Sequence, residues 1–202
     1  MPRKKITSGE ERLVRDLYLK DFTGQEVATQ LKVSLKQVYD SLRRQNIPRK
    51  SLLEQNRLRF QKKPLSFVFS EKLSSKDREL LVAGLMLYYG DGAKTGNTVD
   101  FANSDPMLLK LFLKFLKNIC GIDNEKLRFY LYCFSDQNSN SLIRYWCSHL
   151  SVKPGQFTKP YVRLTLNKGK RTMTNGVLHI RYSDKRLLEK ILLLGREWAS
   201  TL

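Results

Sequence analysis

Leu80-Leu-Val-Ala-Gly-Leu-Met-Leu-Tyr-Tyr-Gly-Asp-Gly92 contains the longest apolar run of the chain and ends in a carboxylate between two glycines. Ten consecutive residues without a charge predict a buried helix and are too few to span a bilayer. Three positions in this helix carry little or no side chain, which lets a neighbouring helix approach closely; they are Ala83, Gly84 and Gly90. The segment therefore predicts a packed helix whose end presents an acid.

The two ends of this helix carry further signals. Ser75 or Asp77 is expected to cap its N-terminus, and Gly92 is a natural left-handed residue at its C-terminus. Asp91 lies in the last turn, where a negative charge opposes the helix macrodipole by about 0.3–1 kcal/mol. Because stability does not favour an acid at this place, Asp91 is a candidate functional residue.

Strand and helix patterns alternate after Gly92. We expect strands at 93–95, 98–103, 126–134, 161–166 and 177–182, and helices at 106–119, 138–150 and 184–199. Asp105 or Ser104 with Pro106 opens the first of these helices, Gly121 ends it, and Asp184 caps the last one. The predicted order is helix, two strands, helix, strand, an extra helix, two strands and helix. A basic loop at 167–172 joins the last two strands.

The motif and this order together resemble the LAGLIDADG homing-endonuclease family over roughly residues 77–200. The resemblance implies an αββαββα domain with one inserted helix. It also implies that two such motif helices pack side by side, here in a homodimer, with the acid of each at the centre of a DNA-binding saddle. Asp91 falls on the acidic position, as a catalytic residue and a ligand of Mg²⁺, and the dimer helix would use Ala83, Gly84, Leu87 and Gly90. Met86 stands where the motif has a small residue, and the first hairpin is short.

Mg²⁺ prefers oxygen ligands and takes few of them from protein. One acidic motif per chain cannot cut both strands, so an active nuclease of this kind must be a dimer with a near-palindromic target. Basic residues near the saddle would stabilise the transition state. The candidates are Lys94 and Lys159 for catalysis, with Arg163 as a phosphate contact.

The N-terminal part reads as three short helices, over 10–20, 23–31 and 34–45. Thr23-Gly-Gln-Glu26 is a capping box, and Ser34 caps the third helix. Residues 22–45 resemble the helix-turn-helix family, with Lys32 in the left-handed turn position where its members often have Gly. A non-Gly residue there costs roughly 1 kcal/mol.

In this interpretation the third helix enters the major groove of double-stranded DNA. Gln and Lys side chains can read base edges, while Arg grips phosphates. The alternative is a solvated polar face of a protein-interaction domain. The DNA-binding candidates of the chain are Lys36, Gln37, Tyr39, Arg43, Arg44, Arg49, Lys50, Arg163, Lys168, Lys170 and Arg171.

The charge supports a polyanionic partner. The 202 residues carry 37 Lys and Arg against 19 Asp and Glu, a net charge of +18. Such an excess predicts binding to nucleic acid or to an anionic surface. The segment from Arg43 to Lys63 contains eight basic residues and a single acid, Glu54. We therefore place a helix-turn-helix domain at 1–50, a basic linker at 51–76, which is either flexible or tracks the phosphate backbone, and the LAGLIDADG-like domain at 77–202.

The compartment is expected to be reducing and cytoplasmic, in association with the nucleoid and without a membrane. Cys120, Cys133 and Cys147 are widely spaced and form no CxxC pair, so buried free thiols are the simplest interpretation. The basic N-terminus has no apolar segment behind it, as a secretory signal would have.

Two functions remain open from the sequence. The first is a dimeric, Mg²⁺-dependent, site-specific DNA endonuclease, favoured by Asp91. The second is a DNA-binding transcription regulator that uses the same fold without cleavage, favoured by the short hairpin and by Met86.

Overall fold

The computed structural model describes residues 6–164 and 173–200, and it shows a mixed α+β protein. The chain divides into two compact units, Met1–Pro64 and Leu65–Leu202. Among the described residues the first unit is all helical and the second contains a four-stranded sheet. The prediction of an α+β chain with an all-α N-terminal domain is confirmed.

Three capped helices form the body of the first unit: α1 (Ser8–Leu19), α2 (Gly24–Leu31) and α3 (Leu35–Arg44). Each begins with a capping box, in which a Thr or Ser side chain accepts from the N3 amide and the N3 side chain accepts from the cap amide. The caps at Thr23 and Ser34 confirm the two starts predicted from the sequence.

The turn between α2 and α3 depends on one left-handed residue. Lys32 has φ 54° and ψ 41°, and its N–H donates to the carbonyls of Ala28 and Thr29. The predicted position of the turn is therefore confirmed. The turn brings Val27 and Ala28 of α2 against Val38 and Leu42 of α3, all of them buried in one core.

The predicted linker at 51–76 is not a single connecting segment. A fourth helix, α4 (Leu52–Lys62), begins at the cap Ser51 and belongs to the first unit. Phe67 is buried in the core of the second unit and pairs with Ile122. Three of the six basic residues of this region, Arg57, Arg59 and Lys62, thus lie on α4. The boundary between the units falls between Pro64 and Leu65.

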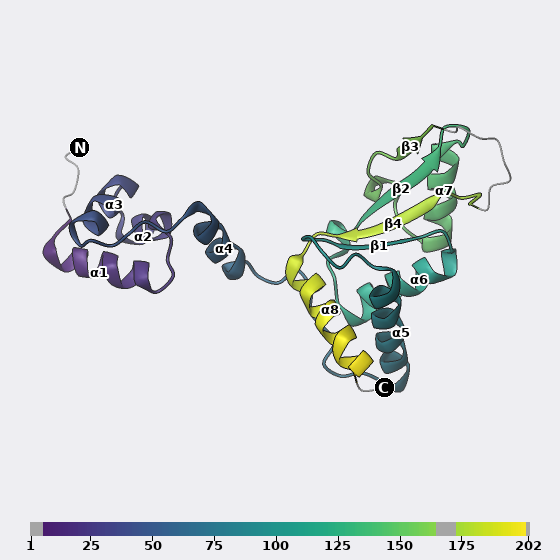
Figure 1. Cartoon of the computed structure of the whole chain (residues 1–202), viewed down its shortest axis with the longest axis horizontal. Coiled ribbons are helices and arrows are strands. Elements are labelled where there is room, and N and C mark those ends of the chain that lie inside the picture. Colours follow the sequence, from purple (N-terminus) through teal and green to yellow (C-terminus); the bar gives the residue numbers. More distant parts are fainter. Residues whose placement is uncertain (1–5, 165–172, 201–202) are drawn as a thin grey trace. The chain divides into compact units, whose positions relative to one another are not determined.

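Within its described residues, 65–164 and 173–200, the second unit contains four α-helices and four strands. Figure 1 shows their arrangement. The helices are α5 (Ser75–Asp91), α6 (Pro106–Lys114), α7 (Ser139–Leu150) and α8 (Lys185–Ser200). A π-helical turn, Phe115–Ile119, extends α6, and short 3₁₀ turns occupy Asn124–Lys126 and Pro154–Gln156. The strands are β1 (Val99–Asn103), β2 (Arg128–Phe134), β3 (Tyr161–Arg163) and β4 (Val177–Tyr182), in the order β1-β4-β2-β3.

Alternation along the strands separates the two faces of the sheet. Phe101, Phe129, Leu178 and Ile180 are buried on one face, against a core built with α5 to α8. Figure 1 shows α5, α6 and α8 on this side. The residues between them point to the other face, on which no helix packs within the part of the chain that the structure describes.

Several predictions about this unit are wrong. Residues 93–95 form no strand, so α5 leads through a loop to β1 without the expected first hairpin. The sequence left the pairing of β3 open; in the structure β3 pairs parallel with β2, and α7 lies between the two strands in the chain. Gly92 is extended, with φ −75°, and the N-cap of α5 is Ser74. The starts of α6 and α8 at Asp105 and Asp184 are confirmed.

Within the described residues, no helix is long and apolar enough to cross a membrane. All three cysteines are free; Cys120 and Cys133 are buried as expected, whereas Cys147 is only half-buried.

Candidate nucleic-acid interface

The outer side of α3 is the candidate reading surface of the first unit. Lys36 is exposed, and the Arg43 side chain is 80% exposed. An Arg43 Nη lies 3.1 Å from the Asp40 carboxylate one turn earlier, so the guanidinium is held near the helix while most of it faces solvent. The buried Val38 and Leu42 fix the opposite side of α3 in the core. The helix thus presents a basic edge at a defined orientation.

Four other predicted DNA contacts on or beside α3, namely Gln37, Tyr39, Arg44 and Arg49, have partners within the first unit. The Gln37 amide oxygen accepts from the Ser34 N–H and completes the cap of α3. Tyr39 packs against the core, under the Arg49 guanidinium at 4.1 Å from its ring centre. Arg44 forms an ion pair with Glu11 of α1 at 2.5 Å. Their first role is to hold the three helices together.

The sequence predicts that Lys50 contacts DNA, and the structure corrects this. Its side chain is only 11% exposed, and its ammonium donates to the carbonyls of Tyr18 and Phe22 at the end of α1. The Lys50 N–H donates to the Tyr18 hydroxyl. A cation at a helix C-terminus satisfies orphan carbonyls and complements the macrodipole. Burial raises the pKa of Tyr18, although the Lys50 amide opposes this effect.

The end of α5 places Asp91 in solvent. Among the described residues none bonds or pairs with its carboxylate. The sequence predicts Lys94 as a catalytic residue, yet its ammonium donates to the carbonyls of Tyr88 at 3.0 Å and Gly92 at 2.5 Å. It therefore caps the end of α5, and only Asp91 of the two is free of a structural bond.

The predicted dimer helix is partly an internal packing element. A Cβ on Gly84 would lie 2.2 Å from Cγ of the buried Phe115, so this glycine serves contact within the chain. Leu87 packs against the same core. Ala83 is half-exposed, and Gly90 is exposed, where an added Cβ would meet nothing within 4 Å. Of the four predicted residues, these last two lie on the outer side of α5.

The uncovered face of the sheet carries a row of aromatic rings from three strands. Tyr132 of β2 lies 4.9 Å, between ring centres, from both Tyr161 of β3 and His179 of β4. Tyr130 lies 5.1 Å from Tyr132 and stacks beneath the Arg181 guanidinium at 4.7 Å. Cross-strand register brings these residues together, since Tyr132 pairs with Tyr161 and Tyr130 with His179.

Asp100 of β1 anchors one end of this row. Its carboxylate accepts from Arg181 Nε at 2.7 Å and lies 2.8 Å from His179 Nδ1. Burial raises the pKa of Asp100, but the bonds to His179 and Arg181 outweigh burial and lower it below its usual value. The carboxylate is therefore ionised and holds both side chains in place.

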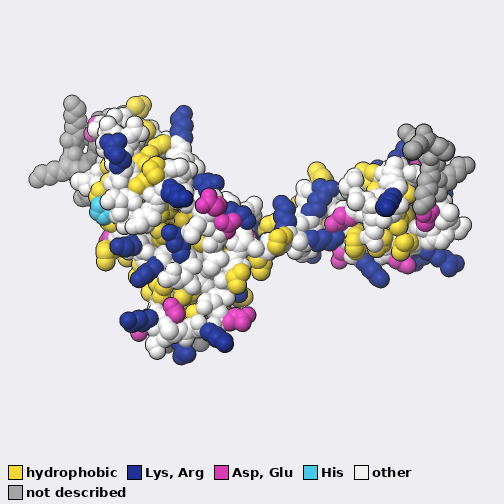
Figure 2. Space-filling view, turned by 180° about the vertical axis from the view of Figure 1, so that it is seen from behind, with side chains coloured by type: hydrophobic (Ala, Val, Ile, Leu, Met, Phe, Trp, Pro, Cys, Tyr) yellow, Lys and Arg dark blue, Asp and Glu magenta, His cyan; other side chains and the backbone are white. Residues whose placement is uncertain are grey.

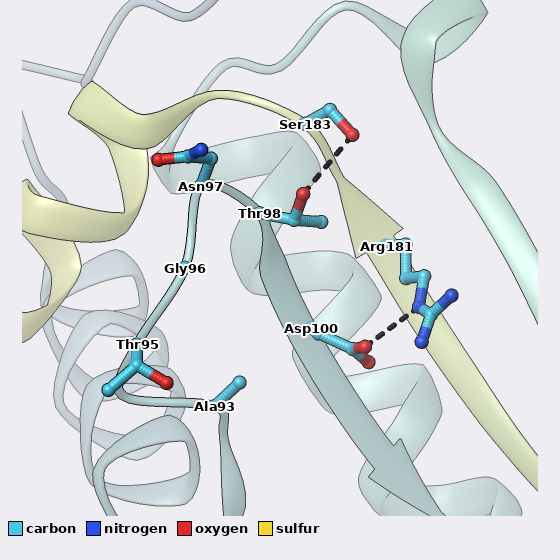
Figure 3. Close-up of a pocket in the computed structure, with 8 residues that line it drawn as sticks. All are labelled: Ala93, Thr95, Gly96, Asn97, Thr98, Asp100, Arg181 and Ser183. Atoms are coloured by element: carbon cyan, nitrogen blue, oxygen red, sulfur yellow. Dashed lines mark hydrogen bonds and ion pairs between the residues drawn. The ribbon is translucent and has the colours of Figure 1, made fainter.

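A shallow pocket of about 360 Å³ opens beside this carboxylate (Figure 3). The loop 93–98 forms one wall, with Asp100, Arg181 and Ser183 opposite, and the hydroxyls of Thr98 and Ser183 are 3.3 Å apart. Figure 3 marks one bond between the two side chains, from Arg181 Nε to the Asp100 carboxylate. Arg181 thus offers an oriented fork of donors.

The remaining predicted contacts are distributed over the second unit. Arg163 ends β3 in register with Phe134, and Lys159 is exposed just before that strand. Lys168, Lys170 and Arg171 lie outside the described residues. No cluster of three or more His, Cys, Asp or Glu side chains that could hold a metal occurs within 6–164 and 173–200.

The sequence interpretation missed the aromatic row, Arg181 and His179. A signal was present in the alternation of β2, where Phe129 and Leu131 point inward and leave Tyr130 and Tyr132 on the other side. Cross-strand neighbours could not be read from the sequence. No family model, curated protein or solved structure matches the chain. Lys and Arg side chains are distributed over both units (Figure 2).

Proposed function

We propose that this protein binds double-stranded DNA, through a helix-turn-helix in the first unit and a LAGLIDADG-like second unit. The observation that carries the proposal is the exposed basic edge of α3, with Lys36 and Arg43, on a helix oriented by the α2–α3 turn. An α-helix fits the major groove, where Lys and Arg reach base edges and phosphates. The net charge of +18 agrees with a polyanionic partner.

The LAGLIDADG-like part of the proposal is supported by the order of elements around α5. This helix ends in Gly90-Asp91-Gly92, and the sheet that follows is covered by helices on one face only among the described residues. In the proposed homodimer the outer side of α5, with Ala83 and Gly90, packs against its copy. The missing strand at 93–95 and the parallel β3 depart from the αββαββα pattern. We therefore assign recognition of the DNA sequence to the first unit.

A Mg²⁺-dependent endonuclease is the second candidate, and the free carboxylate of Asp91 favours it. An exposed, unengaged carboxylate fits one ligand of Mg²⁺, which takes few protein ligands and keeps several waters. The copy of Asp91 in the dimer would supply another. A bound Mg²⁺ would polarise a phosphate of the backbone. If the protein binds DNA without cutting it, the function that we propose for the same architecture is that of a transcription regulator.

The binding proposal is tested with variants matched in charge. Lys36→Ala and Arg43→Ala remove cations from α3, while Lys110→Ala removes one from the exposed side of α6. Affinity is measured by anisotropy with a duplex selected from a random library, over a range of salt. We expect the α3 variants to bind more weakly, each with a salt slope smaller by about 1, and Lys110→Ala to bind as the parent does. Equal effects of all three substitutions would refute the assignment of α3.

Cleavage is tested in the same library with Mg²⁺. Site-specific double-strand breaks that disappear in Asp91→Asn identify the nuclease. Specific binding without breaks, unchanged in Asp91→Asn, identifies the regulator.

A further inference from the structure

The aromatic row on the uncovered face of the sheet has no role in the binding of duplex DNA by α3. Tyr132 and Tyr161 are 37% and 48% exposed, and both belong to strands of the sheet whose other face is packed. Cross-strand aromatic pairs do stabilise sheets. A purely structural pair, however, does not need cations arranged around it.

Basic side chains border the aromatic rings. Arg181 stacks on Tyr130, and Arg163 follows Tyr161 by two residues on the same side of β3. Among the strand residues on this face the single acid is Asp100, and it is already bonded to Arg181 and His179. The face therefore combines exposed ring surface with more arginines than acids, since Arg128, Arg163 and Arg181 lie on it with Asp100.

We infer that this face binds unpaired nucleotides, with bases stacked on Tyr132 and Tyr161 and phosphates held by Arg163 and Arg181. Bases within a duplex are stacked on one another and offer no ring face to a protein, whereas unpaired bases stack on aromatic side chains. An open sheet with aromatic residues on adjacent strands is an established platform for two or three such bases.

Phosphate binding follows from the way Arg181 is held. Asp100 engages only the Nε, at 2.7 Å, and Tyr130 supports the guanidinium plane. The two Nη nitrogens, to which Asp100 makes no bond, can then bind a phosphate as a fork of donors, with little ordering left to occur on binding. The inference is independent of whether α3 binds duplex DNA.

The test uses the full chain and labelled 12-nucleotide single strands, oligo(dT) and oligo(U), with a duplex of mixed sequence for comparison. Tyr132→Ala and Tyr161→Ala are each expected to weaken single-strand binding by about 5- to 150-fold. Tyr132→Phe and Tyr161→Phe keep the ring and are expected to bind as the parent does. Leu193→Ala, on the exposed side of α8, is the control for loss of surface apolar area.

The Phe variants and a cross-linking measurement keep the result interpretable if an Ala variant unfolds. In the unaltered protein, 5-iodouridine placed in the oligo(U) is irradiated and the attached peptide is identified by mass spectrometry. Attachment at Tyr132 or Tyr161 supports the inference, and attachment confined to the first unit overturns it. Equal affinity of the Ala and Phe variants, or no single-strand binding by the parent, also overturns it.

The two nucleic-acid strands distinguish RNA from DNA as the natural ligand. Preference for oligo(U) over oligo(dT) indicates RNA, and the reverse indicates single-stranded DNA; both support stacking. Failure here is separable from failure of the α3 assignment, because the tyrosine variants are tested on single strands and the α3 variants are tested on the duplex.

Discussion

Replacement of Gly84 by Ala tests the packing of α5 against the π-helical turn. The new Cβ would lie 2.2, 2.5 and 2.6 Å from three carbons of Phe115, where ordinary contact begins near 3.4 Å. Phe115 is fully buried and is packed against Phe112, so it cannot turn into solvent. Either α5 or the ring must therefore shift by about 1 Å, which is roughly the shortfall that the contact distances imply.

Two effects of opposite sign decide the magnitude. Overpacking of a filled core costs about 1–3 kcal/mol, and a contact this short belongs at the upper end of that range. Replacement of Gly by Ala inside a helix returns about 1 kcal/mol. The net loss for Gly84→Ala is then about 2 kcal/mol, a fall of about 8 °C in Tm for a unit of this size.

Gly90→Ala is the matched control on the same helix. A Cβ at Gly90 meets nothing within 4 Å, so only the helical preference remains and the free energy of unfolding should rise by up to about 1 kcal/mol. Tm is measured by calorimetry at several protein concentrations. A higher Tm for Gly84→Ala would refute the packing, and a lower, concentration-dependent Tm for Gly90→Ala alone would show that its outer side contacts a second copy.

Three other substitutions test single features of the two units. Asp100→Asn should lower the free energy of unfolding by about 1–3 kcal/mol near pH 6, measured by urea titration. Because the pKa of Asp100 is depressed in the folded state, this difference should shrink as pH falls through that pKa. A difference that stays constant with pH would contradict an ionised Asp100 bonded to His179 and Arg181. Lys50→Met should destabilise the first unit by about 1–3 kcal/mol in thermal melts, because its ammonium bonds to two carbonyls. The affinity for duplex DNA should be unchanged while the unit is folded. Weaker DNA binding at unchanged stability would show that Lys50 contacts DNA. Lys32→Gly should raise the stability of the first unit by up to about 1 kcal/mol, since φ is 54° there, and a lower Tm would argue against the left-handed turn.

The local structure of this chain was predictable because it depends on neighbours in sequence. Capping boxes at Thr23 and Ser34 begin α2 and α3, and Asp105 and Asp184 begin α6 and α8. The wrong predictions concern places where no local signal is decisive, as at residues 93–95 and at the extended Gly92.

The candidate site was predictable only in its residue types. Lys36 and Arg43 lie on the exposed side of α3, as helical periodicity requires. Lys50 and Lys94 carry the same charge, yet their ammonium groups bond to carbonyls at helix ends. Composition cannot separate a lysine that binds a phosphate from one that caps a helix.

By itself the sequence determined most of the helices, the caps at Thr23, Ser34, Asp105 and Asp184, the large positive charge and the alternation that makes one side of each strand apolar. Only the tertiary structure decided which strands are neighbours, and so brought Tyr132 and Tyr161 together and placed Asp100 between His179 and Arg181. It also turned Gly84 toward Phe115. The physical reason is that caps and periodicity are set within a few residues of chain, whereas strand order and helix packing depend on contacts between segments tens of residues apart.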